Sequence, residues 1–180
     1  LRKEDGLFCD HPLVFSVPVI FPGHQENARI VQEQEIIKSL KSLEPDFFIT
    51  FAFGQILSQE VIDIPKYATI NLHASLLPEY RGANPISSAI ADGKKYTGIT
   101  TMKTVLELDA GDIYLTEKID ITPNMNVIEL MKIISDLSPN LLDKTLKGIY
   151  NDSIIPTKQD ESKATFTKKI KKEEKLINWN

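Results

Sequence analysis

The sequence predicts an α/β fold in which helices cover both faces of a mostly parallel sheet. Apolar and polar stretches alternate along the chain in the way that βα units do. Residues 46–53 form a continuous aromatic and β-branched run, which is typical of a strand covered on both faces of a parallel sheet. A second apolar strand, residues 68–72, follows a short helical stretch, so a right-handed crossover is expected to make the two strands parallel.

Three elements are predicted around these strands. Residues 14–21 have strand character, but Pro18 interrupts them, which indicates an edge strand or an irregular segment. Residues 25–43 carry apolar side chains at helical spacing, which predicts an amphipathic helix. Ser58 is expected to cap a short helix that ends at Ile62.

The middle of the chain predicts one helix and a pair of strands. Residues 84–91 are expected to form a helix that the Asp92-Gly93 turn ends. Residues 97–105 and 112–121 are β-branched runs around a loop, which predicts an antiparallel strand pair.

The last part of the chain predicts one long helix and a polar tail. Asn126 and Glu129 have the spacing of a capping pair for a helix over residues 127–150. Pro139 predicts a break or a restart within that helix. Residues 156–180 are polar and rich in lysine, so we expect a tail that crosses the surface.

Composition narrows the classes of function. A chain of 180 residues that is 42% hydrophobic can bury one good core, so we expect one domain. We also expect a monomer. The net charge of −4 offers no general attraction for nucleic acid or an anionic membrane. Cys9 is the single cysteine, which excludes an internal disulfide and a multi-thiolate metal site. The sequence has no apolar run of membrane-spanning length, and the lack of an initiator Met leads us to expect a fragment or a processed product.

A candidate catalytic site lies at the end of the strand over residues 68–72. Asn71 and His73 alternate along this strand, so their side chains share a face at the edge where open α/β sheets bind ligands. Asp109 lies in the loop LELDAGD, which can bring a carboxylate to the same edge. The other interpretation is a structural histidine, a turn-forming Asn71 and a solvated Asp109.

Other chemistries fit the sequence less well. Ser75 lies near His73, but no G-x-S-x-G motif surrounds it, which favours a turn hydroxyl over a hydrolase nucleophile. Cys9 and His11 lack the further ligands of a metal site, so no metal is expected. The sequence also contains no glycine-rich phosphate loop.

The string NLHASLLPEYRGANPI, residues 71–86, resembles the signature of the folate-dependent formyltransferases. In that family an Asn, a His and a later Asp form the catalytic centre, and LDAGD is similar to the loop that carries the Asp. The resemblance implies a Rossmann-like formyltransferase fold in which Asn71, His73 and Asp109 are catalytic.

Within this superfamily the chain is most similar to the methionyl-tRNA formyltransferases, through SLLPEYRGANPI. The stretch PDFFITFAFGQIL, residues 45–57, resembles their strand and folate-contacting loop. The stretch TFTKKIKKEEKLINW, residues 165–179, resembles the segment that leaves their catalytic domain. The resemblance thus implies a catalytic domain over residues 1–155 and a linker over 156–180, toward a carboxyl-terminal β-barrel that is absent from this chain.

The implied activity moves a formyl group from 10-formyltetrahydrofolate to the α-amino group of initiator methionyl-tRNA, in translation initiation. Asn71 would donate to the developing oxyanion, and His73 would donate to it and carry a proton. Asp109 would either orient His73 or take the amine proton through a water. The alternatives are a formyltransferase for a small amine, such as an amino sugar nucleotide, and a non-catalytic folate-binding fragment. The implied location is the bacterial cytoplasm, with an organelle as the alternative.

The resemblance also implies a folate pocket and contacts to the acceptor. The implied folate-binding residues are Phe53, Gly54, Gln55, Ile56, Leu57, Ser75, Leu76, Leu77, Pro78 and Asp112. A cis bond before Pro78 is compatible with this fold. Arg81 is expected to contact either a phosphate of the acceptor RNA or the Glu79 carboxylate. Asn84 is expected to cap a helix and to alter the floor of the acceptor site. The family's opening strand is not recognisable in residues 1–13, so we expect an amino-terminal part that is either incomplete or strongly diverged.

Overall fold

The protein is described by a computed structural model over residues 26–53 and 56–170. Residues Leu1–Ile36 and Ile37–Asn180 form two compact units, and the features below belong to the second, apart from the start of the first helix. The strand predicted at residues 14–21 lies outside the described residues.

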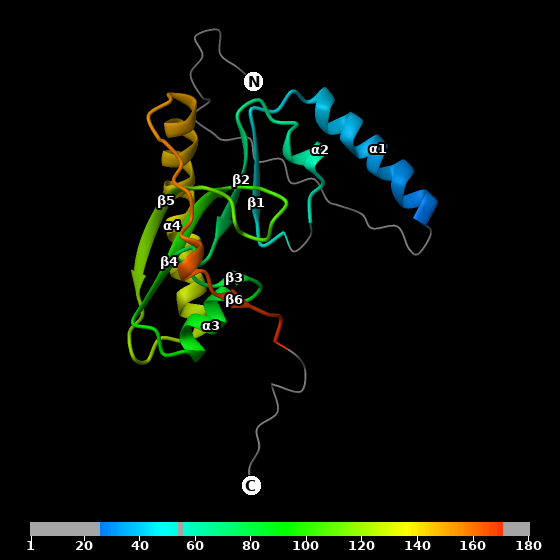
Figure 1. Ribbon diagram of the computed structural model, residues 1–180. Helices are drawn as coiled ribbons and strands as arrows, with labels where there is room; N and C mark the ends of the chain where they lie inside the picture. The colour runs from blue at the N-terminus through cyan, green and yellow to red at the C-terminus, as the bar shows by residue number, and fades with distance from the viewer. Residues whose placement is uncertain (1–25, 54–55, 171–180) are drawn as a thin grey trace. The chain divides into compact units, whose positions relative to one another are not determined.

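The main sheet has four strands in the order β1-β2-β4-β5 (Figure 1). β1 (Phe47–Phe51) pairs in parallel with β2 (Ala68–His73). β4 (Tyr96–Lys103) is antiparallel to both of its neighbours, β2 and β5 (Ile113–Asp120). Three of the four strands therefore run in one direction, which confirms the mostly parallel sheet with an antiparallel pair beside the Asp109 loop.

The four predicted helices are present. They are α1 (Glu26–Ser42), α2 (Gln59–Ile62), α3 (Pro85–Ala91) and α4 (Val127–Tyr150). The capping box of Asn126 and Glu129 is confirmed, because each side chain bonds the other residue's backbone N–H. Ser58 holds the N-cap position of α2, but its side chain makes no capping bond.

Helices lie on both faces of the sheet. Thr101 of β4 bonds Thr145 of α4 through the two hydroxyls, 2.8 Å apart. Leu72 is paired with Thr101 and shares its face, so Thr69, three residues earlier in β2, points to the opposite face. There the Thr69 hydroxyl donates to the carbonyl of Ile62 at the end of α2, at 2.8 Å.

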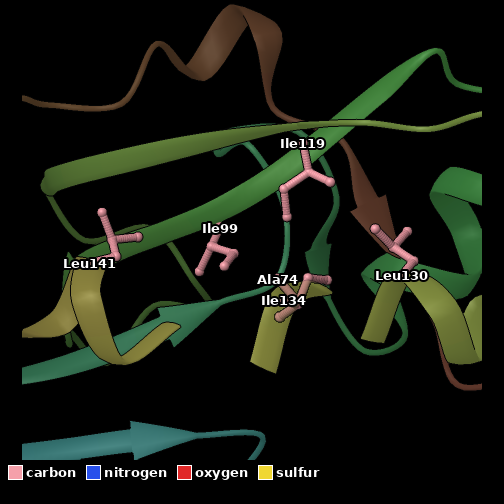
Figure 2. Packing of buried hydrophobic residues seen from close by; sticks show 6 residues of the cluster. All are labelled: Ala74, Ile99, Ile119, Leu130, Ile134 and Leu141. Carbon is pink, nitrogen blue, oxygen red and sulfur yellow. The ribbon is translucent and has the colours of Figure 1, made fainter. Parts of the chain in front are cut away.

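The hydrophobic core lies between α4 and the antiparallel strands. Figure 2 shows its buried members, Ala74, Ile99, Ile119, Leu130, Ile134 and Leu141. Three of them come from one face of α4, and two come from β4 and β5. Burial of each large apolar side chain stabilises the fold by about 1.5–3 kcal/mol. The core therefore fixes the two strands from whose connecting loop Asp109 projects.

The predicted break at Pro139 is wrong, because α4 continues through it. A proline inside a helix removes one backbone hydrogen bond and costs about 3 kcal/mol. Leu130 and Ile134 before the proline and Leu141 after it are all buried. Their shared burial outweighs the local cost of Pro139.

The prediction that the strand over residues 46–53, now β1, is covered on both faces is also wrong. Ile49 and Phe51 of β1 are 45% and 49% exposed. Within the described residues β1 is an edge strand whose single sheet neighbour is β2. An apolar run alone does not distinguish a central strand from an edge strand.

A second, two-stranded sheet joins distant parts of the chain. β3 (Arg81–Gly82) pairs in parallel with β6 (Phe166–Thr167). Thr157 forms a bridge with Ile113, at the start of β5. Residues 157–167, which we call the return segment, also contain a short 3₁₀ helix, Glu161–Lys163, and lie beside β3 and β5. Among the described residues, no helix is long and apolar enough to cross a membrane.

Candidate active site

Asn71 and His73 extend from β2 toward Asp109. The Asn71 Nδ2 atom lies 3.4 Å from Asp109 Oδ1, and the His73 Nδ1 atom lies 3.6 Å from Asp109 Oδ2. The side chains of His73 and Asp109 are 7% and 13% exposed. The structure therefore brings together the three residues that the sequence singled out, on the face of the sheet opposite α4.

Thr50 fixes the orientation of the Asn71 amide. The parallel register places Thr50 of β1 directly beside Asn71, and the Thr50 hydroxyl donates to Asn71 Oδ1 at 2.9 Å. With its oxygen engaged there, the amide presents Nδ2 to Asp109. Thr50 was not among the predicted site residues, although its position in the strand before β2 was a usable signal.

The His73 ring has an oxygen acceptor beside each nitrogen. Its Nε2 lies 2.8 Å from the carbonyl oxygen of Tyr80, and a carbonyl can only accept, so Nε2 carries a hydrogen. Nδ1 faces the Asp109 carboxylate. His73 can therefore gain and lose a proton at Nδ1 without breaking its bond to Tyr80.

The Asp109 carboxylate is held by backbone as well as side-chain donors. The Gly82 backbone N–H donates to Asp109 Oδ2 at 2.8 Å. Asp109 itself has a φ of 49°, in the left-handed region that costs energy for most residues. Its backbone carbonyl accepts a bond of 2.8 Å from the side chain of Gln159. Gly82 and Gln159 were missed because they lie far from Asp109 in the sequence.

The turn after β2 is tied to β4. The Thr100 hydroxyl donates to the Ser75 carbonyl at 2.7 Å, and the Leu77 N–H donates to the same hydroxyl at 3.2 Å. The Ser75 hydroxyl donates to the Glu79 carbonyl at 2.6 Å, which supports the turn interpretation of this serine. The Leu77–Pro78 bond is cis.

The remaining predicted folate-binding residues have varied surroundings. Phe53 and Ile56 are 37% and 89% exposed, whereas Gly54 and Gln55 lie outside the described residues. Leu57 and Leu76 are partly buried, and the Asp112 carbonyl accepts from the Lys103 N–H at 2.9 Å. The folate-binding role of these residues stays a prediction.

Arg81 meets neither of its expected partners. The side chain is 0% exposed, and its guanidinium donates to Gln159 and Glu161. The expected salt bridge with Glu79 is wrong, because Glu79 pairs with Lys94 at 2.7 Å. A contact with an RNA phosphate is also disfavoured, since β3 turns this guanidinium inward, against the return segment.

Asn84 occupies the N-cap position of α3, as predicted. Its side chain makes no capping bond, however, because its backbone is left-handed with φ of 60°. The amide instead lies 3.4 Å from the carbonyl oxygen of Lys168.

Three further features bear on the candidate site. Burial and a hydrogen bond of 2.7 Å to Asp92 raise the pKa of Tyr80 above its ordinary 10, so its phenol keeps its proton even in alkaline solution near pH 10. Within residues 26–53 and 56–170, no group of three or more His, Cys, Asp or Glu could hold a metal, and Cys9 and His11 lie outside those ranges. A hollow of about 640 Å³ between α3 and β6 is lined by neither His73 nor Asp109.

Comparisons with known proteins identify the family of this chain. A sequence model of a family described as formyl transferase matches residues 16–146. The chain is 46% identical over 168 residues to a methionyl-tRNA formyltransferase of Clostridium perfringens, covering 93% of this chain and 53% of that protein. It is 44% identical over 171 residues to the Bacillus subtilis methionyl-tRNA formyltransferase, covering 95% and 52%. The chain thus spans about half the length of these curated relatives.

A solved structure gives the same fold. HypX from Aquifex aeolicus, in complex with tetrahydrofolic acid, superimposes with a TM-score of 0.70 at 21% identity. The match covers 81% of this chain and 25% of HypX. At 21% identity, the likeness to HypX shows the fold alone. The formyl transferase family model, by contrast, matches most of the sequence. This chain therefore belongs to the formyl transferase family.

Proposed function

We propose that this protein transfers a formyl group from 10-formyltetrahydrofolate to the α-amino group of initiator methionyl-tRNA. The observation that carries the proposal is the convergence of Asn71, His73 and Asp109. The 46% identity to a methionyl-tRNA formyltransferase supports this acceptor. The bacterial relatives also support a cytoplasmic location, and a monomer is still our prediction.

The reaction requires an oxyanion donor. The amine nitrogen forms a bond to the formyl carbon, and the resulting tetrahedral intermediate carries negative charge on oxygen. The bond from this carbon to N10 of the folate then breaks, N10 gains a proton, and the amine loses one. In our proposal Asn71 Nδ2 donates to the oxyanion, a contribution whose loss costs about 3 kcal/mol in barrier height.

His73 is proposed to carry the proton. Its Nδ1 is the ring nitrogen that does not bond the Tyr80 carbonyl, so it can take the amine proton and return it to the leaving nitrogen. Of the two roles considered for Asp109, we favour orientation of His73: Asp109 Oδ2 is held by Gly82 and lies 3.6 Å from Nδ1, which is close enough to attract a proton on this nitrogen but too far for a hydrogen bond that would close Nδ1 to the amine. Such proton transfer accelerates a reaction about 100- to 10,000-fold.

The folate is proposed to bind beside the turn after β2. Phe53 and Ile56 offer exposed apolar side chains, and residues 75–78 offer a turn that Thr100 fixes. A flat pterin ring requires apolar contacts and a few placed hydrogen bonds. HypX, with the same fold, was solved with tetrahydrofolic acid, which supports a folate for this chain.

An acceptor assay tests the proposal. The protein would be mixed with 10-formyltetrahydrofolate and either methionyl initiator tRNA or an amino sugar nucleotide. We expect a formylated methionyl-tRNA and no formylated sugar. Formylation of the sugar alone would contradict the proposed acceptor, and folate binding without transfer to either acceptor would favour a non-catalytic protein.

A further inference from the structure

Three side chains connect the return segment to the loop that carries Asp109. Glu161 accepts from the Arg81 guanidinium through both carboxylate oxygens, at 2.6 and 2.9 Å. The same guanidinium donates to Gln159 Oε1 from Nε and Nη2, at 3.0 and 2.8 Å. Gln159 Nε2 then donates to the backbone carbonyls of Asp109 and Gly111, at 2.8 and 2.7 Å.

The Gln159 amide is fully used by these contacts. An amide has two N–H donors and one oxygen with two lone pairs, and Gln159 uses both hydrogens on the loop and its oxygen on Arg81. A rotated amide would turn its oxygen toward two carbonyls and its N–H groups toward a cation. Arg81 therefore specifies which end of Gln159 faces the Asp109 loop.

The loop that carries Asp109 requires hydrogen bonds from neighbouring segments to hold its conformation. Asp109 adopts a left-handed φ of 49°, a conformation that persists where surrounding contacts hold it. Its carboxylate is held by Gly82, the residue next to Arg81, and its backbone is held by Gln159. Contacts from β3 and from the return segment thus act on the same residue.

We propose that Gln159 is a positioning residue for formyl transfer, which sets the place of the Asp109 carboxylate relative to His73. Arg81 and Glu161 fix the Gln159 amide for this task. The proposal rests on the proposed function, since it concerns the same reaction. Gln159 touches no reacting atom and acts through Asp109.

The first test is Gln159→Leu, which keeps the approximate size of the side chain and removes its polar atoms. A displacement of a catalytic group by about 1 Å costs up to about 100-fold in rate. We expect kcat for methionyl-tRNA formylation to fall about 10- to 100-fold, with KM for the formyl donor within about twofold of wild type. Asn140→Leu, the same kind of change at an exposed position of α4, serves as the control and should leave kcat unchanged.

A double-mutant cycle separates positioning from general support. If Gln159 acts through Asp109, Gln159→Leu causes no further loss of kcat in an Asp109→Asn protein. A structural role would lower kcat by the same factor in both backgrounds. Single-turnover rates measure the slow variants, and the ¹⁵N resonances of the His73 ring give a second readout that needs no acceptor.

The outcomes are distinct. An unchanged kcat in Gln159→Leu, or equal factors in the two backgrounds, overturns the positioning role while leaving the proposed function intact. Lack of transfer by the wild-type protein overturns the proposed function. In that case the ¹⁵N resonances of His73 test the positioning role of Gln159. If the role is correct, Gln159→Leu shifts the Nδ1 signal as Asp109→Asn does. An unshifted Nδ1 signal in Gln159→Leu refutes the positioning role.

Discussion

The backbone N–H of Gly82 donates a hydrogen bond of 2.8 Å to the Asp109 carboxylate. Gly82 has a φ of 98°, and a Cβ atom at this position would lie 2.5 Å from the backbone oxygen of Thr167. Glycine is therefore required twice, for its backbone conformation and for the close approach of β6. The geometry of the candidate site thus depends on a residue that contributes no side chain.

Gly82→Ala is expected to destabilise the fold by at least about 2 kcal/mol, since the left-handed strain of about 1–2 kcal/mol adds to a backbone clash. Urea denaturation measures this free energy of unfolding. Gly93→Ala is the matched control, because Gly93 also has a positive φ, 63°, but has no atom within 4 Å of an added Cβ. Equal losses in the two variants would show that the approach of Thr167 is unimportant.

Thr50→Val is expected to lower kcat for formyl transfer about fivefold to tenfold, because it removes the hydroxyl that orients the Asn71 amide, a bond of about 1 kcal/mol. Thr50→Ser retains the donor and should keep most of the activity. Steady-state kinetics of both variants measure the effect. If valine and serine had the same kcat, the hydroxyl would have no part in orienting Asn71.

The return segment should confer a pH dependence on stability. Hydrogen bonds from Arg81 lower the pKa of the Glu161 carboxyl from its ordinary 4.5, so the folded state favours the charged form. This contribution is fully present above about pH 4.5 and is lost as the pH falls through the lower, folded pKa. The difference in unfolding free energy between wild type and Glu161→Gln should therefore be largest near pH 7 and should shrink in acid.

Asp160 provides a comparison at lower pH. Bonds from the Ser162 hydroxyl and Lys163 lower the pKa of Asp160 from 3.8 to about 2. The stability difference between wild type and Asp160→Asn should therefore persist to about pH 4 and disappear only toward pH 2. Denaturation curves from pH 7 to pH 2 measure both windows. A difference that grew as the pH fell would have the wrong sign for a lowered pKa.

Pro139→Ala is expected to stabilise the protein by about 2 kcal/mol. The helix-interior penalty of proline, about 3 kcal/mol, exceeds the advantage of up to about 1 kcal/mol that proline gives by restricting the unfolded chain. Pro139 is exposed, so alanine leaves no cavity. Thermal unfolding followed by circular dichroism measures the change, and a lower melting temperature would indicate that Pro139 makes favourable contacts.

Short-range sequence patterns predicted the elements whose structure depends on residues close together in the chain. The alternation of Asn71 and His73 along a strand predicted their common face, and the capping pair before α4 was visible at a spacing of three residues. The role of Asp109 came from the family resemblance. Its approach to β2 depends on the antiparallel strands that the long helix holds in place.

Long-range contacts account for what the sequence did not predict. Arg81 bonds residues 78 and 80 positions away, and no periodic pattern links it to Gln159 or Glu161. Exposure of β1 depends on its place at the edge of the described sheet, which its apolar sequence does not reveal. Pro139 was misjudged because burial on both sides of it outweighs its local penalty.

The most direct test of the account is the single-turnover rate of formyl transfer to methionyl-tRNA by Asn71→Ala, beside its affinity for the folate donor. If Asn71 donates to the oxyanion, the rate falls about 100- to 1,000-fold while the folate dissociation constant changes little. A variant that transfers the formyl group at the wild-type rate would contradict the assignment of Asn71, His73 and Asp109 as the catalytic centre.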